Sequence, residues 1–237
     1  MNNFAGIHVD NVTLNEAIDK VRGFFASADP HMIVTPNPEM IVAAQADQEL
    51  KEIINSADLR VPDGISMVVV SRILKKPLKE RVSGIDLMLK IIGVFSRQGK
   101  KVYLLGGGAG IAEAAAEKLI SEYPGIRITG IHDGYFNQDV EVIQNIKEAQ
   151  PDILFVGLGA GRQEKWLNRH LKELNVPVAM TIGGSLDVIS GHKKRAPKIF
   201  QKMCIEWLYR LITEPHRWKR QLALPKFLWL MFVESAS

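Results

Sequence analysis

One carboxylate in this sequence stands out as a group that could do acid–base chemistry. Asp63 lies in the turn VPDG at residues 61–64, directly before an apolar stretch. An Asp-Gly pair is most often only a turn. A carboxylate held beside a pocket can also act as a general base toward a sugar hydroxyl. On these residues alone, both interpretations stand.

Thr35 and Asn37 offer a hydroxyl and an amide in the segment TPNPE at residues 35–39, which follows an apolar run and opens a helical pattern. The simpler interpretation is a capping turn with proline at an early helical position. The two prolines would also make a binding loop rigid. We therefore expect a stiff polar loop at the end of a strand.

Three glycine-rich turns also follow apolar runs, at residues 105–110 (LGGGAG), 157–166 (GLGAGRQEKW) and 182–187 (IGGSLD). The backbone amides of Gly106 and Gly107, ahead of a helix, could approach a phosphate, although such a turn alone is a weak signal. Gln163 could hydrogen-bond a sugar, and Asp187 a base or ribose. Each of these two residues could equally belong to an ordinary helix start or cap.

The C-terminal segment differs in charge from the rest of the chain. Residues 193–237 carry ten Lys or Arg against three Glu, a net charge of +7, whereas residues 1–192 carry 20 basic and 23 acidic residues, a net charge of −3. Such a segment points to a polyanion or an anionic membrane. If the helix continued past Pro215, Arg210, Arg217 and Arg220 would share one face. They suit phosphate oxygens, or could form a solvated or lipid-contacting basic face.

Several kinds of site and segment are not expected. The single cysteine, Cys204, cannot form an internal disulfide, and the six histidines are scattered, so we expect no metal and no cofactor. The N-terminal segment lacks the pattern of a signal peptide. Because there is no apolar run of about 18 residues, we expect no membrane-spanning helix. If the chain meets a membrane, it lies on the surface.

Strands and helices alternate in the expected secondary structure. Apolar, β-branched runs predict strands at residues 31–35, 101–105, 126–131, 152–158 and 177–182. Amphipathic stretches predict helices at residues 13–27, 38–55, 84–98, 110–122, 138–149 and 162–174. Thr13 and Glu16 form a capping box for the first. This alternation predicts an α/β fold, a mostly parallel Rossmann-like sheet with helices on both faces, and ligands beyond the carboxyl ends of the strands.

The chain length is consistent with one core and an extension. At 237 residues we expect a single α/β core over residues 1–192. Residues 193–237 would form a basic, amphipathic helical appendage that associates with a membrane, since apolar residues between Ile199 and Ile212 recur at helical spacing.

Seven motifs, in this order, resemble those of the WecG/TagA/CpsF family of bacterial glycosyltransferases: TPNPEM, VPDG, LLGGG, GLGAGRQEKW, GGSLDVISG, KRAPK and EWLYRLITEPHRWKRQ. The similarity runs through nearly the whole chain, and the last two motifs are specific. The resemblance implies an inverting, metal-independent transfer of N-acetylmannosamine from UDP to undecaprenyl-diphosphate-linked N-acetylglucosamine. The expected partners are the UDP-sugar donor, this lipid-linked acceptor and an anionic membrane surface on the cytoplasmic side.

The resemblance also implies roles for individual residues. Asp63 would be the general base that deprotonates the acceptor's 4-hydroxyl, with Thr35 and Asn37 lining the sugar site. Gln163 would act near the donor. The glycines and Asp187 would hold UDP, and the three tail arginines would stabilise the diphosphate. The full set of other substrate-binding candidates is Arg81, Gly106, Gly107, Tyr135, Asp187, Arg210, Arg217 and Arg220. We further expect the tail arginines to complete the site only when the tail folds over the core.

Rival interpretations remain at this point. A nicotinamide-dependent oxidoreductase would need an acidic residue at a strand end about 20 residues after the glycine turn, but Glu122 lies in a predicted helix and Asp133 comes late. The basic tail could contact nucleic acid, with tryptophans stacking on bases, although we do not expect this partner. The donor could carry a uronic acid or a plain hexose, and the apolar side of the tail could seal a homo-oligomer.

Overall fold

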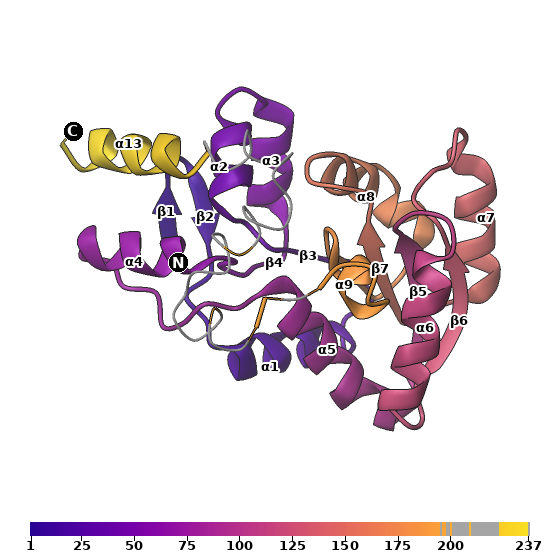
Figure 1. The fold of residues 1–237 in the computed structure, drawn as a ribbon. Coiled ribbons are helices and arrows are strands. Elements are labelled where there is room, and N and C mark those ends of the chain that lie inside the picture. The colour runs from indigo at the N-terminus through magenta and orange to yellow at the C-terminus, as the bar shows by residue number, and fades with distance from the viewer. Residues whose placement is uncertain (195, 198–199, 201–208, 210–222, 237) are drawn as a thin grey trace.

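The computed structural model of the protein describes residues 1–194, 196–197, 200, 209 and 223–236. At its centre is a six-stranded sheet with the order β4-β3-β8-β7-β5-β6, in which every pairing is parallel. The strands are β3 (His31–Val34), β4 (Leu59–Arg60), β5 (Lys101–Gly106), β6 (Arg127–His132), β7 (Ile153–Gly157) and β8 (Val178–Thr181). The predicted parallel α/β fold is confirmed (Figure 1).

Helices cover both faces of this sheet (Figure 1). On one face lie α2 (Pro38–Ala44), α3 (Gln48–Ser56), α7 (Asp139–Ala149) and α8 (Arg162–Leu174). On the other lie α1 (Leu14–Phe24), α5 (Gly84–Phe95) with its 3₁₀ turn η1 (Ser96–Gln98), α6 (Ile111–Glu122) and α9 (Ser185–Ile189). Alternate residues of β7 enter the two clusters, Leu154 one and Phe155 the other, because successive strand side chains point to opposite faces.

The prediction of one helix over residues 38–55 was wrong. The chain leaves α2 at Gln45, and Asp47 caps α3 by accepting a hydrogen bond from the Leu50 N–H at 3.0 Å. A side-chain oxygen that satisfies a free backbone N–H makes a new helix start competitive with continuation. The sequence reasoning also missed α4 (Ile65–Ile73), α9, β4 and the antiparallel hairpin of β1 (Asn2–Phe4) and β2 (Ile7–Val9).

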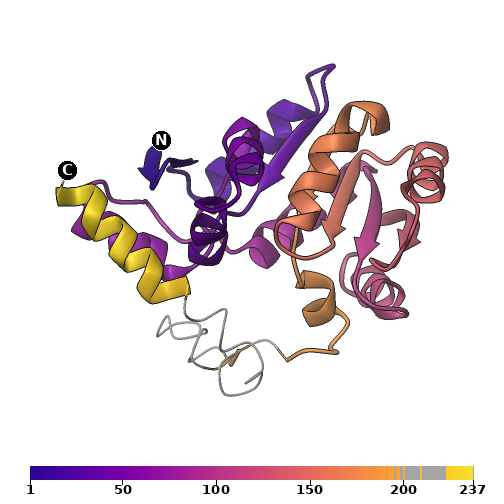
Figure 2. The ribbon, with the colours of Figure 1, turned by 90° about the horizontal axis from the view of Figure 1, so that it is seen from above.

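The last described element, α13 (Ala223–Ala236), packs against α2 and α4 (Figure 2). Its Phe227 and Met231 are buried in the same cluster as α2. The helix predicted between residues 199 and 212 lies outside the described residues, apart from Phe200 and Tyr209. The division at residue 192 stays a prediction. Within the described ranges, no helix is both long and apolar enough to cross a membrane.

Candidate active site

The loops after β3 and β4 are joined to each other and to the segment before α5. Three backbone hydrogen bonds of 2.9–3.0 Å do this, from Val61 N–H to Val34 O, from Asp63 N–H to Pro36 O and from Val82 N–H to Pro62 O. Gly64, at φ +107°, then starts α4 in a conformation that side-chain-bearing residues rarely adopt. Asp63 is half-buried in this arrangement. Its backbone is therefore fixed beside the loop that carries Thr35 and Asn37.

Thr35 and Asn37 are held in different ways. Thr35 is buried and packs against Gly84, the first residue of α5: a Cβ on Gly84 would lie 3.4 Å from the Thr35 hydroxyl oxygen. Asn37 is the N-cap of α2, since its Oδ1 accepts a hydrogen bond from the Met40 N–H at 3.0 Å. The capping turn is therefore present, and the cap does not use the amide nitrogen of Asn37.

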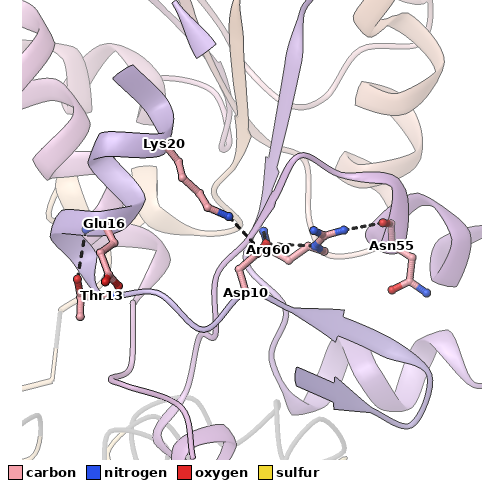
Figure 3. Close-up of polar contacts among 6 residues, drawn as sticks. All are labelled: Asp10, Thr13, Glu16, Lys20, Asn55 and Arg60. Atoms are coloured by element: carbon pink, nitrogen blue, oxygen red, sulfur yellow. Dashed lines mark hydrogen bonds and ion pairs between the residues drawn. The ribbon is translucent and has the colours of Figure 1, made fainter. Parts of the chain in front are cut away.

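Asp10 anchors the strand that leads to Asp63 (Figure 3). Its Oδ2 accepts hydrogen bonds from Arg60 N–H at 2.9 Å and Nε at 3.2 Å, and its Oδ1 accepts one from Lys20 Nζ at 3.1 Å. Arg60 also donates to the Asn55 carbonyl at 2.7 Å. Burial raises the pKa of Asp10, but the bonds and charges of Arg60 and Lys20 outweigh it and hold this pKa below 3.8. An ionised carboxylate thus holds β4 next to α1.

The loops after β5, β6, β7 and β8 meet backbone to backbone. A Cβ on Gly106, at φ +137°, would collide with the carbonyl oxygen of Gly157, and one on Gly157 would lie 2.7 Å from the carbonyl oxygen of Gly183. Gly107 N–H donates to Gly157 O at 3.3 Å, and Gly134 N–H donates to Gly107 O at 2.8 Å. Only residues without side chains let four loops converge this closely. This end of the sheet is therefore built largely from glycine backbone.

Gln163 and Glu164 link two of these loops from inside the protein. Gln163 is 3% exposed; its Oε1 accepts a hydrogen bond from Gly183 N–H at 3.0 Å, and its Nε2 donates to Glu164 Oε1 at 2.6 Å. The other oxygen of Glu164 accepts the Gly161 N–H at 2.7 Å. Burial raises the pKa of Glu164, against the hydrogen bonds from Gln163 and Gly161. Gln163 therefore positions the β8–α9 loop, using both ends of its amide.

Asp187 and Tyr135 lie on either side of this glycine-rich end. Asp187, in α9, is 3.4 Å from Lys193 Nζ and accepts the Lys193 N–H on its carbonyl at 2.8 Å. Tyr135 follows β6 and is 81% exposed. Next to it, the Arg162 guanidinium lies 5.2 Å from the centre of the Phe136 ring, a cation–π contact that joins the start of α8 to this loop.

The remaining sequence-predicted site residues are Arg81 and the three tail arginines. Arg81 precedes α5 and lies 3.9 Å from Asp86. Arg210, Arg217 and Arg220 lie outside the described residues. In the part of the chain that the structure describes, no three His, Cys, Asp or Glu side chains gather as they would around a metal ion.

The structure thus brings the candidates together in two groups at the carboxyl ends of the strands. We call the loops after β3 and β4, with Thr35, Asn37 and Asp63, the Asp63 region. We call the loops after β5, β7 and β8, with Gly106, Gly107, Gln163 and Asp187, the glycine region. The chain runs from β5 to one side of the sheet and from β7 to the other, so the glycine region lies at a topological switch point, where ligands bind in open α/β sheets.

Sequence reasoning missed Asp10, Glu164 and Gly183 as residues that shape the site. Glu164 had a recognisable signal, because it stands three residues after the N-cap Gly161, as in a capping box. Asp10 and Gly183 had none, since their partners Arg60 and Gln163 are 50 and 20 residues away in the sequence.

Known proteins resemble this chain over nearly its full length. Residues 2–237 match the family described as "Glycosyl transferase WecG/TagA/CpsF family". A relative from Staphylococcus aureus is 38% identical over 227 residues, which cover 94% of this chain and 89% of the relative. One from Bacillus subtilis is 38% identical over 196 residues, or 83% of this chain and 77% of the relative. Both are named N-acetylglucosaminyldiphosphoundecaprenol N-acetyl-beta-D-mannosaminyltransferase.

The match spans both regions of the site, from the Thr35 loop through the turn at Gly183. A carboxyl group at one region and glycine turns ahead of helices at the other are compatible with sugar transfer from a nucleotide. The chain belongs to the WecG/TagA/CpsF family of glycosyltransferases.

Proposed function

We propose that this enzyme transfers N-acetylmannosamine from UDP to undecaprenyl-diphosphate-linked N-acetylglucosamine, with inversion and formation of a β-1,4 linkage. The relatives' names support the sugar and the acceptor. The observation that carries the chemistry is the Asp63 carboxyl on a backbone pinned beside the Thr35 loop. The product would be an intermediate of wall teichoic acid linkage-unit synthesis, made at the inner face of the cell membrane.

The proposed reaction is a single displacement. The Asp63 carboxylate takes the proton of the acceptor's 4-hydroxyl as its oxygen forms a bond to the anomeric carbon of the donor. The bond from that carbon to the UDP oxygen breaks on the opposite side, and UDP leaves with the electron pair. Thr35 and the amide nitrogen of Asn37 would orient the sugar hydroxyls near Asp63.

The glycine region would hold the UDP portion of the donor. The start of α6 follows Gly110, whose lack of a side chain leaves the first helical N–H groups without a side-chain cap, and such N–H groups bind phosphate oxygens. Three strand spacings separate β3 from β5, or about 14 Å. A nucleotide sugar laid along the strand ends would bridge this span, with its sugar toward Asp63 and its diphosphate at the glycines.

A donor panel tests the proposed reaction. Purified enzyme would be given a lipid-diphosphate N-acetylglucosamine acceptor and, in turn, the UDP derivatives of N-acetylmannosamine, its uronic acid, N-acetylglucosamine and glucose. We expect turnover with UDP-N-acetylmannosamine and a β-linked product by NMR. Preference for another donor would replace the sugar while keeping the reaction class, whereas an α-linked product would contradict the inverting mechanism.

Asp63→Asn tests the proposed base. Loss of a positioned general base slows transfer by about 10²–10⁴-fold, while the melting temperature should stay close to that of the wild type because Asp63 is bonded to the neighbouring loop through its backbone. Asp29→Asn, a change at an exposed loop carboxylate, is the matched control. Near-normal turnover by the Asp63 variant would rule out this residue as the base.

The tail arginines are proposed to neutralise the leaving diphosphate when the tail closes over the core. Truncation near residue 195 is a poor test, because it also removes Phe227 and Met231 from the hydrophobic core. Replacing Arg210, Arg217 and Arg220 together by Gln keeps those residues. Transfer should fall while the melting temperature holds; unchanged transfer would exclude the arginines from the site.

A further inference from the structure

Two helices carry most of the large hydrophobic residues that are exposed in the described chain. Large hydrophobic residues that are exposed on α4 and α13 are Val69, Ile73, Leu228, Trp229, Phe232 and Val233. The remaining ones, at positions 1, 120, 135 and 140, are scattered over other elements. The two helices are in contact, and both views show them together at one end of the molecule (Figures 1 and 2). We call this surface the α4–α13 face.

The outer side of α13 is unusual for a helix in water. Phe227 and Met231, one turn apart, point into the core, while Leu228 and Trp229 on the other side are 45% and 64% exposed. A helix at the surface of a water-soluble protein normally presents polar residues outward, and one that is apolar all round is covered on its second side. On α4, Met67 and Val70 are buried and Ile73 is exposed. Both helices therefore present apolar side chains outward.

The charged residues along most of these two helices are basic, with Glu234 near the end of α13 as the exception. The segments 65–76 and 223–233 contain four basic residues and no acidic ones. The four, all exposed, are Arg72, Lys75, Lys76 and Lys226. Apolar side chains with a tryptophan, bordered by cations, are suited to the interface of an anionic bilayer. A second copy of the chain, docked symmetrically on the same face, would bring these cations toward one another.

The α4–α13 face is also directly connected to the Asp63 region. α4 begins two residues after Asp63, at Ile65, and ends at Ile73. At 1.5 Å per residue, these eight steps span about 12 Å. A bilayer in contact with Ile73 would thus lie close to the loop that holds the proposed base, at a range where a lipid-linked sugar diphosphate could reach it.

We propose that α4 and α13 together form a docking face for an anionic lipid bilayer. The inference extends the proposed function, which requires a lipid-linked acceptor, and it places membrane contact on a core helix as well as on the C-terminal segment. Leu228 and Trp229 enter the interface beside Ile73 and Val69, and the four cations lie at the level of the lipid headgroups.

The test compares binding of the full-length protein to vesicles of phosphatidylcholine with and without phosphatidylglycerol. Val69→Ser with Ile73→Ser, and separately Leu228→Ser with Trp229→Ser, should each weaken binding to the anionic vesicles by about tenfold or more. Lys75→Glu with Lys76→Glu changes no apolar side chain. Loss of each positive charge should weaken vesicle binding about fivefold. Because this pair reverses two charges, it should weaken binding further than the loss of two charges would. Ile120→Ser with Val140→Ser, at exposed apolar positions on α6 and α7, is the matched control and should bind normally.

Transfer assays separate this inference from the proposed function. The docking variants should turn over a water-soluble acceptor analogue like the wild type and lose turnover only on acceptor embedded in vesicles. A protein that binds vesicles through this face but transfers no sugar would overturn the function and leave the docking face standing. Normal vesicle binding by all three variant pairs would overturn the docking face. The docking face would also be overturned if the wild-type protein were a dimer and the pair Val69→Ser with Ile73→Ser converted it to a monomer.

Discussion

The Asp63 region and the glycine region lie at the same end of one sheet but are built differently. The Asp63 region is held by the Asn37 cap and by backbone hydrogen bonds between loops. The glycine region is held by loops in direct backbone contact and by buried Gln163 and Glu164. Changes in the first should remove function and spare the fold, whereas changes in the second should remove both.

Gly106→Ala should have the largest effect on stability. The new Cβ would collide with the Gly157 carbonyl oxygen, and φ +137° is strained for alanine. We expect the free energy of unfolding to fall by about 4 kcal/mol, measured by denaturant unfolding, with transfer activity lost. Gly108→Ala is the control, because its added Cβ would have Ile111 Cγ1 at 3.8 Å as nearest neighbour. Equal stability of the two variants would show that the glycine contacts are not needed.

Glu164→Leu should come next. This substitution removes the acceptor of the buried Gln163 Nε2 and of the Gly161 N–H. We expect the free energy of unfolding to fall by about 3 kcal/mol. Glu164→Gln keeps the shape of the side chain and one acceptor oxygen, so it should recover part of the lost stability. If Gln163 acts by positioning Gly183, the KM for the UDP-sugar should rise in Glu164→Gln with little change in kcat. A drop in kcat at unchanged KM would instead place Gln163 in the chemical step.

Much of the site's location followed from the sequence, because strands read from β-branched apolar runs place Thr35, Gly106, Gln163 and Asp187 at one end of a parallel sheet. The orientation of Gln163 did not follow. Which groups an amide contacts depends on its three-dimensional neighbours, and Gly183 contacts Gln163 because β8 pairs with β7. Asn37 is a helix cap in the structure, and its role as a site residue stays a prediction that the cap does not contradict, since one amide can serve both roles.

Local propensity explains the missed elements. The run Val68-Val69-Val70 in α4 is rich in β-branched residues that favour strands, yet the segment is helical because Met67 and Val70 pack into the core beside α2 and α13. The break between α2 and α3 carries neither glycine nor proline, and only the Asp47 cap marks it. Tertiary packing decided the first case and a single side-chain hydrogen bond the second.

Asp10→Asn should have a moderate effect that depends on pH. At pH 7 the variant loses charge-assisted hydrogen bonds from Arg60 and Lys20, and we expect about 2 kcal/mol less stability. Because the folded-state pKa of Asp10 is lowered, its contribution is present above the unfolded-state value and is lost as pH falls through the folded-state pKa. Unfolding curves for the two proteins should therefore converge below pH 3.8. A difference that stays constant at still lower pH, where the carboxyl is protonated in both states, would mean that the charge of Asp10 contributes nothing.

Tyr135→Ala should have the smallest effect on the fold and so isolates a contact to substrate. Tyr135 is 81% exposed, and its loop is held instead by the hydrogen bond that its backbone N–H donates to the Asp133 carboxylate oxygen Oδ1 at 2.7 Å. We expect stability to change by less than about 0.5 kcal/mol, while the KM for the UDP-sugar rises, because an aromatic ring beside the glycine region can stack on a base. Val140→Ala, 75% exposed on the next helix, controls for loss of exposed apolar surface. If both variants keep the wild-type KM, the nucleotide does not reach the loop after β6, and the glycine region binds the diphosphate alone.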